Sequence, residues 1–119
     1  MTSNIHEFIR TVVGDELVDI ARVMAGQLEY DIDENAYAVF KHYIEKRMEL
    51  PYFSNARTVR NAMDRARMNS AIRTFERFAI NGENGGVCTV QDLKSIQAED
   101  FQVLLDDILN ADVDKRIFS

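Results

Sequence analysis

PYFSNARTVRNAMDRARM, residues 51–68, is the stretch that sets the organisation of this 119-residue chain. Pro51 pushes the residue before it out of the helical region, so a helix that precedes it must end there. Asn55 is a residue type that commonly caps helix N-termini. The apolar spacing of three and four that follows predicts a long helix over residues 56–80.

This predicted helix carries two apolar stripes. Val59, Met63 and Ala66 project in one direction, and a second stripe lies about 180° away on the helical wheel. The second stripe contains Met68, Ile72, Phe75 and Ala79. We therefore expect the helix to bury different faces along its length, and expect its methionines to belong to the core.

Apolar spacing also predicts helices on both sides of this stretch. We expect a short first helix that ends or kinks at Gly14, a second that starts at Asp15 and runs to Leu28, and a third that is capped by Asp33. A final helical region starts at Thr89 or Val90. Extended residues at 30–32 and 87–90 could form one minor two-stranded contact. The sequence thus predicts an all-α fold, a small helical bundle of about five helices.

Composition favours one ordinary globular domain. Hydrophobic residues make up 46% of the chain and charged residues 29%. No apolar run is long enough to span a bilayer, and the first residues resemble neither a signal nor a transit peptide. The single cysteine, Cys88, fits a reducing compartment, so we expect bacterial cytoplasm or plastid stroma.

Charge is distributed unevenly along the chain. The formal net charge is -6, yet residues 55–77 contain six basic and two acidic side chains, whereas residues 1–34 contain two basic and eight acidic ones. An acidic chain without exposed aromatics between its basic residues is not typical of nucleic-acid binding. The basic stretch of the long helix is therefore the candidate site for a smaller anion.

Four charged side chains, Arg57, Arg60, Asp64 and Arg67, fall on one side of the predicted helix. The ordinary interpretation is a solvated face with a local Asp64–Arg67 ion pair. Arg57, however, lies at the helix N-terminus, where a cation is disfavoured by roughly 0.3–1 kcal/mol. Free backbone N–H groups together with Arg57 and Arg60 would form a receptor for an anion, above all phosphate.

Other chemistry finds little support. His6 and His42 lack metal-ligand spacing, so we predict no metal site. The acidic pairs Glu99-Asp100 and Asp106-Asp107 are interpreted as a solvated face, and no residue is predicted to be catalytic.

The stretch 51–68 resembles a segment of CbbX-type AAA+ ATPases, the red-type Rubisco activase family, that reads P-x-F-x-N-A-R-x-[VI]-R-N-A-[LM]-D-R-A-R-[LM]. Residues 15–21 are similar to the start of the C-terminal helical lid of this family. Leu93, Ile96, Glu99 and Asp100 fit its L-x-x-I-x-x-E-D pattern, and residues 115–119 resemble its last residues. The similarity covers 15–119, which leaves 1–14 as an N-terminal extension or short helix.

The resemblance implies a lid that closes over ATP and Mg²⁺ held by a separate ATPase domain. Arg57 matches the sensor-2 arginine, which reaches the terminal phosphates of the nucleotide. Arg60 then supports the nucleotide site or a subunit contact, and Asn55, Asp64 and Arg67 support that helix face. The implied partners are the AAA+ core, neighbouring ring subunits and, indirectly, Rubisco.

The chain contains no G-x-x-x-x-G-K-[ST] motif, so we expect no enzyme activity from it in isolation. A stand-alone helical module that binds a partner protein remains the alternative.

Overall fold

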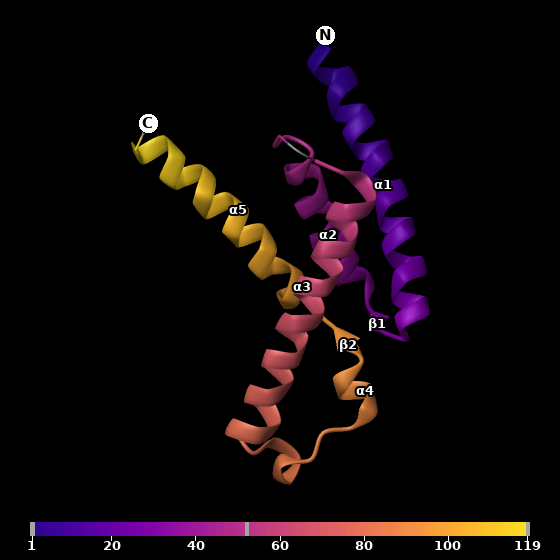
Figure 1. Ribbon diagram of the computed structural model, residues 1–119, viewed down its shortest axis with the longest axis vertical. Helices are drawn as coiled ribbons and strands as arrows, with labels where there is room; N and C mark the ends of the chain where they lie inside the picture. Colours follow the sequence, from indigo (N-terminus) through magenta and orange to yellow (C-terminus); the bar gives the residue numbers. More distant parts are fainter. Residues whose placement is uncertain (1, 52, 119) are drawn as a thin grey trace.

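The computed structural model describes residues 2–51 and 53–118, with side chains placed for residues 5–51 and 53–111. Tyr52 of the matched motif and the side chains of the matched tail at 115–119 thus lie outside the described residues. The all-α prediction is confirmed (Figure 1). The helices are α1 (Thr2–Leu28), α2 (Glu34–Arg47), α3 (Asn55–Phe75), α4 (Val90–Leu93) and α5 (Ala98–Phe118).

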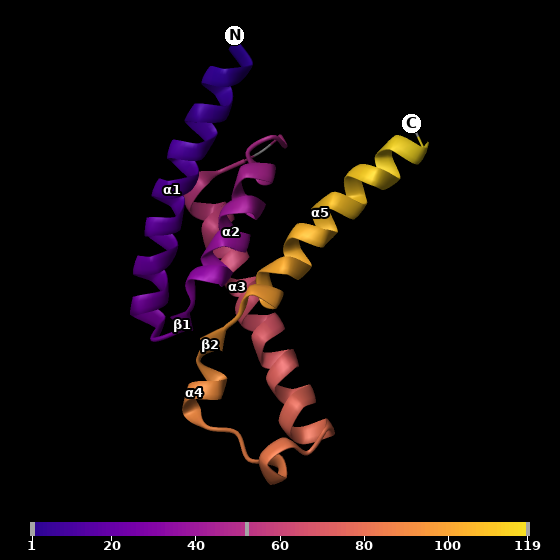
Figure 2. The ribbon, with the colours of Figure 1, turned by 180° about the vertical axis from the view of Figure 1, so that it is seen from behind.

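The helices form a packed body from which several helix ends project. α2 contacts α5 and α1, and α3 contacts α5 and α1. Both ribbon views show the C-terminal half of α3 leaving this body together with the turns that follow it, while the C-terminal half of α5 diverges from α1 and α2 (Figures 1 and 2). The first turns of α1 extend beyond the end of α2.

The core lies where four helices meet. α2 and α5 contribute Phe40 and Phe101, both fully buried, with ring centroids 5.3 Å apart in an edge-to-face arrangement. Other fully buried side chains surround this pair; they include Leu17, Ile44, Val59, Met63 and Leu104. α3 therefore buries the Val59–Met63 stripe, as the sequence predicts.

The second apolar stripe of α3 is not buried, and this prediction was wrong. Met68 is 64% exposed and Phe75 is 61% exposed, because the C-terminal half of α3 leaves the body before any other helix covers that side. The helix continues as a π-helical turn at Glu76–Ile80, close to the predicted end at residue 80.

The predicted break at Gly14 is also wrong, since α1 runs through it without interruption. Gly14 is buried against α2, where an added Cβ would lie 3.4 Å from Glu45 Oε1 and 3.6 Å from Lys41 Cε. These are ordinary van der Waals distances, so Gly14 lies in the α1–α2 contact without ending or breaking the helix. Asp15 is not a cap; its carboxylate pairs with Lys41 at 2.7 Å. The division into 1–14 and 15–119 stays a prediction.

Asp33 caps α2 as predicted. Its carboxylate accepts a hydrogen bond of 2.8 Å from the Ala36 backbone N–H, and its backbone is extended. We expect Asp33→Ala to lower the free energy of unfolding by about 1 kcal/mol, because one N–H at the helix start loses its acceptor. Urea denaturation followed by circular dichroism measures this. Asn35→Ala, an exposed change two residues later, is the control and should leave the denaturation midpoint unchanged.

The two-stranded contact is present, but with a different partner. β1 (Asp31–Ile32) pairs in parallel with β2 (Ser95–Ile96), so that Asp31 is opposite Ser95 and Ile32 is opposite Ile96. Thr89 and Asp92 form a capping box that starts α4, so residues 90–93 are helical. The strand therefore forms at residues 95 and 96 instead of at 87–90. The predicted single C-terminal helical region is therefore split into α4 and α5.

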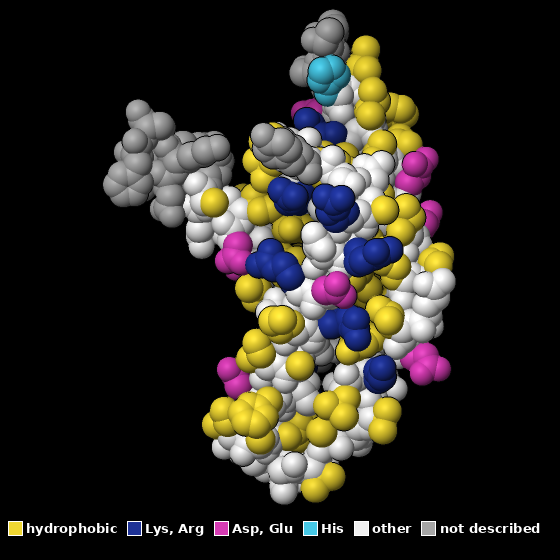
Figure 3. Space-filling view, in the orientation of Figure 1, with side chains coloured by type: hydrophobic (Ala, Val, Ile, Leu, Met, Phe, Trp, Pro, Cys, Tyr) yellow, Lys and Arg dark blue, Asp and Glu magenta, His cyan; other side chains and the backbone are white. Residues whose placement is uncertain are grey.

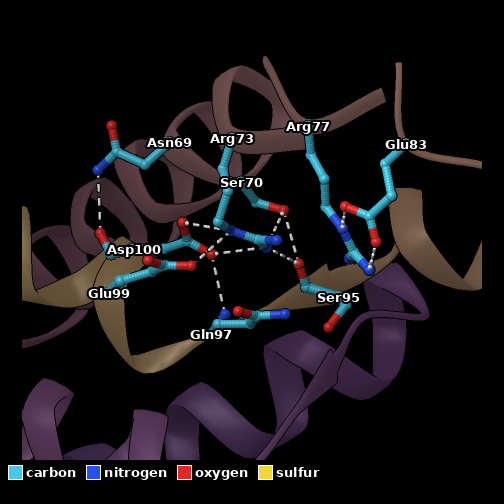
Figure 4. Close-up of polar contacts among 9 residues, drawn as sticks. All are labelled: Asn69, Ser70, Arg73, Arg77, Glu83, Ser95, Gln97, Glu99 and Asp100. Carbon is cyan, nitrogen blue, oxygen red and sulfur yellow. Dashed lines mark hydrogen bonds and ion pairs between the residues drawn. The ribbon is translucent and has the colours of Figure 1, made fainter. Parts of the chain in front are cut away.

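Asp100 was wrongly interpreted as part of a solvated acidic face. Figure 4 shows its carboxylate facing the Arg73 guanidinium, with contacts of 3.2 and 3.1 Å, and accepting the Gln97 backbone N–H at 2.9 Å. Arg73 also donates to the Ser95 carbonyl oxygen at 3.1 Å. Asp100 is 1% exposed, so this buried ion pair joins α3 to β2 and to the start of α5.

Candidate functional site

The start of α3 is an open, electropositive helix end. Ser54 occupies the N-cap position without a side-chain cap hydrogen bond, and the first turn contains no acidic residue. Asn55 is the first helical residue rather than the cap, so that prediction was wrong. The N–H groups of a first helical turn have no partner within the helix. Among the described residues no side chain caps this end, which presents N–H donors and the positive pole of the helix dipole.

Arg57 and Arg60 project from the first two turns of α3, and both are exposed. Neither forms an ion pair with any residue whose side chain the structure describes. Figure 3 shows Lys and Arg side chains gathered over this part of the molecule. Two unpaired guanidinium groups beside an uncapped helix end suit a phosphate, because arginine donates paired hydrogen bonds to its oxygens.

Arg60, Asp64 and Arg67 also line a groove of about 250 Å³ between α3 and the end of α1. The rest of the lining is Met24, Gln27, Leu28 and Met63. The structure thus brings these three predicted residues together, whereas Arg57 and Asn55 lie outside the groove. The contribution of α1 was missed, because nothing in the sequence indicates that residues 24–28 lie beside α3.

Arg67 is held by its own chain, unlike Arg57 and Arg60. Its guanidinium lies over the Tyr30 ring, 5.2 Å from the centroid, and the predicted pair with Asp64 is confirmed at 3.5 Å. The pKa of Arg67 lies above its ordinary value. The polar side chain of Tyr30 is the larger cause of this rise, and Asp64 is the smaller one. The Arg67 Nε atom is buried and has no hydrogen-bond partner among the described residues. Arg67 is therefore placed to shape the groove wall.

Two further properties of the described residues bear on function. No group of three or more His, Cys, Asp or Glu side chains among them could hold a metal ion. No helix among them is both long and apolar enough to cross a membrane.

Comparison with known proteins identifies this arrangement of helices. The model of the AAA lid domain family matches residues 14–111, which include all of α2, α3 and α4 and most of α5. The chain belongs to the AAA lid domain family.

The relatives of this AAA lid are CbbX-type proteins, as the motif at 51–68 predicted. The chain is 51% identical over 87 residues to a chloroplastic cbbX homolog of Guillardia theta, covering 73% of this chain and 23% of that protein. It is equally similar over 87 residues to a chloroplastic ribulose bisphosphate carboxylase/oxygenase activase of Cyanidioschyzon merolae, of which it covers 28%. The plasmid-encoded CbxX protein of Cupriavidus necator is 41% identical over 86 residues, or 72% of this chain and 25% of that protein.

The AAA lid thus spans about a quarter of the length of the curated relatives it matches. Membership of the family and the fold are established by these findings. The roles of Arg57, Arg60, Asn55, Asp64 and Arg67 stay predictions.

Proposed function

We propose that this lid closes over a nucleotide bound by an ATPase domain and contributes Arg57 as the sensor-2 arginine. The observation that carries the proposal is the start of α3, where an exposed arginine stands at an uncapped helix end without an acidic neighbour in the first turn. A cation at the positive end of a helix is unfavourable unless an anion joins it. A terminal phosphate supplies that anion.

The residues of this face fit a nucleotide phosphate, and each has a different role. Arg57 donates two parallel hydrogen bonds to phosphate oxygens, and Arg60, one turn further, adds a second positive charge. Asn55 lies in the first turn beside Arg57. Asp64 and Arg67 form an ion pair further along α3, where both line the groove. ATP, with Mg²⁺ held by the ATPase domain, supplies the free energy for remodelling when it is hydrolysed.

The relatives suggest the larger assembly in which the lid acts. One of them is named an activase of ribulose bisphosphate carboxylase/oxygenase, so we propose that the lid serves an AAA+ ring that remodels Rubisco. The direct partners are then the ATPase core and neighbouring ring subunits. Two relatives are described as chloroplastic and one as plasmid-encoded, which suits plastid stroma or bacterial cytoplasm.

Arg57→Ala tests the role of this side chain. The matching quarter of the Cyanidioschyzon merolae activase is replaced by this chain, and ATP hydrolysis is measured at saturating ATP. We expect the rate to fall at least about tenfold, because a charge-assisted hydrogen bond contributes roughly 1.5–3 kcal/mol. Arg65→Ala is the matched control: Arg65 is also exposed on α3, but it pairs with Asp107 at 2.8 Å, and its loss should not change the rate.

A pull-down with the chain as bait, with and without ATP, tests the alternative. Capture of an AAA+ core that strengthens with ATP and weakens in Arg57→Ala supports the lid role. Capture of another protein, indifferent to nucleotide and to Arg57, would replace it with a stand-alone interaction module.

A further inference from the structure

The helical segment that begins with α3 stops at the dipeptide Asn81–Gly82. The π-helical turn continues α3 to Ile80, and Asn81 is its C-cap, whose backbone N–H donates to the Glu76 carbonyl oxygen at 2.9 Å. Gly82 follows with φ of 70°, a left-handed conformation that ends helices and that glycine adopts without steric penalty. Both residues are exposed, at the far end of the half of α3 that leaves the body (Figures 1 and 2).

An asparagine that precedes glycine can lose its side-chain amide without an enzyme. The glycine backbone nitrogen attacks Cγ of the asparagine, so that a new C–N bond forms and the Cγ–Nδ2 bond breaks. The proton of the attacking nitrogen leaves with Nδ2 as ammonia, and a succinimide ring remains. Glycine favours this step because it has no Cβ to obstruct the approach of its nitrogen.

Water completes the reaction by opening the succinimide ring. Hydrolysis at Cγ gives aspartate, whereas hydrolysis at the backbone carbonyl gives isoaspartate, in which the main chain runs through the former side chain. In both cases an amide and water become a carboxylate and ammonium. The product is therefore more acidic than the parent chain, whose formal net charge is already -6.

The chain contains two such dipeptides, Asn81–Gly82 and Asn84–Gly85, and the structure restrains the second. The Gly85 backbone N–H, which would have to attack, donates to the Gly82 carbonyl oxygen at 3.1 Å. The Asn84 amide, which would have to leave, donates through Nδ2 to the Val87 carbonyl oxygen at 2.9 Å. Val87 also donates its backbone N–H to the Asn84 carbonyl oxygen at 3.2 Å. Ring closure at Asn84 must first break these hydrogen bonds.

The reacting groups of the first dipeptide are not restrained in this way. Among the residues that the structure describes, no acceptor binds the Gly82 backbone N–H and no partner binds the side-chain amide of Asn81. The hydrogen bond from Asn81 to Glu76 uses the Asn81 backbone N–H, which takes no part in ring closure. An exposed segment with few hydrogen bonds also opens at low free-energy cost.

We propose that Asn81 is a site of spontaneous deamidation in the folded chain and that Asn84 is protected from the same reaction. The glycine that ends the helix by its left-handed conformation also supplies the reactive nitrogen. The inference does not depend on the proposed nucleotide role.

The product changes the end of the helix in two ways. A carboxylate at a helix C-terminus is unfavourable, because the helix dipole places its negative pole there. Isoaspartate also lengthens the main chain by a methylene group between residues 81 and 82, where the helix stops. The next turn stays attached by the ion pair of Arg77 with Glu83, which has contacts of 2.6 and 2.7 Å (Figure 4).

Incubation of the 119-residue chain in mildly alkaline buffer, which favours loss of the proton from the attacking nitrogen, tests the proposal. Trypsin cuts after Arg77 and Lys94 and so releases residues 78–94, which contain both dipeptides. Fragmentation of this peptide in the mass spectrometer locates each product, and labelled oxygen from the solvent marks passage through the ring. We expect deamidation at least about tenfold faster at Asn81 than at Asn84, because hydrogen bonds must open first at Asn84.

The same chain in denaturing urea is the control for the effect of the fold. Both dipeptides should then react at similar rates, because the hydrogen bonds around Asn84 are lost. Asn81→Gln is the matched variant: it keeps an amide at this exposed position, but its longer side chain closes a ring slowly, so the fast product should disappear.

Three results overturn the proposal. The first is a folded chain in which Asn81 reacts no faster than Asn84, and the second is a folded chain in which neither residue reacts. The third is a preference for Asn81 that persists unchanged in urea, because it would then arise from neighbouring residues and not from the fold.

Discussion

Asp100→Ala should lower the free energy of unfolding by about 3 kcal/mol, a large share of the roughly 5–15 kcal/mol that stabilises a domain. The change removes the carboxylate that faces Arg73, whose side chain is only 17% exposed, and leaves a mostly buried cation with fewer partners. It also removes the acceptor for the Gln97 backbone N–H at the start of α5. Urea denaturation of the parent and the variant measures the loss.

Glu99→Ala is the control for this prediction. Glu99 lies 3.3 Å from the same Arg73, but its side chain is 63% exposed, so removing it should cost less than about 1 kcal/mol. In a double-mutant cycle, Arg73→Ala with Asp100→Ala should lose less stability than the sum of the two single changes, because no buried charge is then left unpaired. Equal losses for Asp100→Ala and Glu99→Ala would contradict the assignment of the buried pair.

Phe101→Ala should lower the free energy of unfolding by about 3–5 kcal/mol. The Phe101 ring is fully buried and meets Phe40 at 5.3 Å between centroids, in the most extensive helix contact of the fold, that of α2 with α5. Removing the ring leaves a cavity that the surrounding helices can fill only in part, and it removes the edge-to-face contact. Thermal and urea denaturation should both report the change.

Phe75→Ala provides the comparison at an exposed ring of the same type. Phe75 lies on the uncovered side of α3, and its replacement should change the free energy of unfolding by less than about 0.5 kcal/mol. A loss similar to that of Phe101→Ala would mean that the outer face of α3 is covered in the monomer.

Several local signals in the sequence predicted the local structure correctly. Asp33 and Thr89 start helices as expected, because a cap depends on hydrogen bonds to backbone only three residues away. The helical class, the long central helix and its buried Val59–Met63 stripe also follow from residue type and spacing. Arg57 and Arg60 were placed on the correct turns of α3 for the same reason.

Two errors are local, because Asp15 and Asn55 were wrongly assigned as caps. The other errors concern contacts between residues far apart in the chain. Gly14 indicates a break when it is considered alone, but it is buried within a continuous α1 that packs against α2. Asp100 resembles a surface acid until Arg73, 27 residues earlier, is brought against it. Met68 and Phe75 have the spacing of a buried stripe, but spacing does not reveal whether another helix is present to cover it.

The unbroken α1 has a mechanical consequence. At 1.5 Å per residue its 27 residues form a rod of about 40 Å, and no joint separates the turns that extend past α2 from those anchored in the core by Leu17 and Ala21. A load applied near Ile5 is therefore transmitted to the rest of the lid as rotation of a stiff lever, without the slack of a flexible tether.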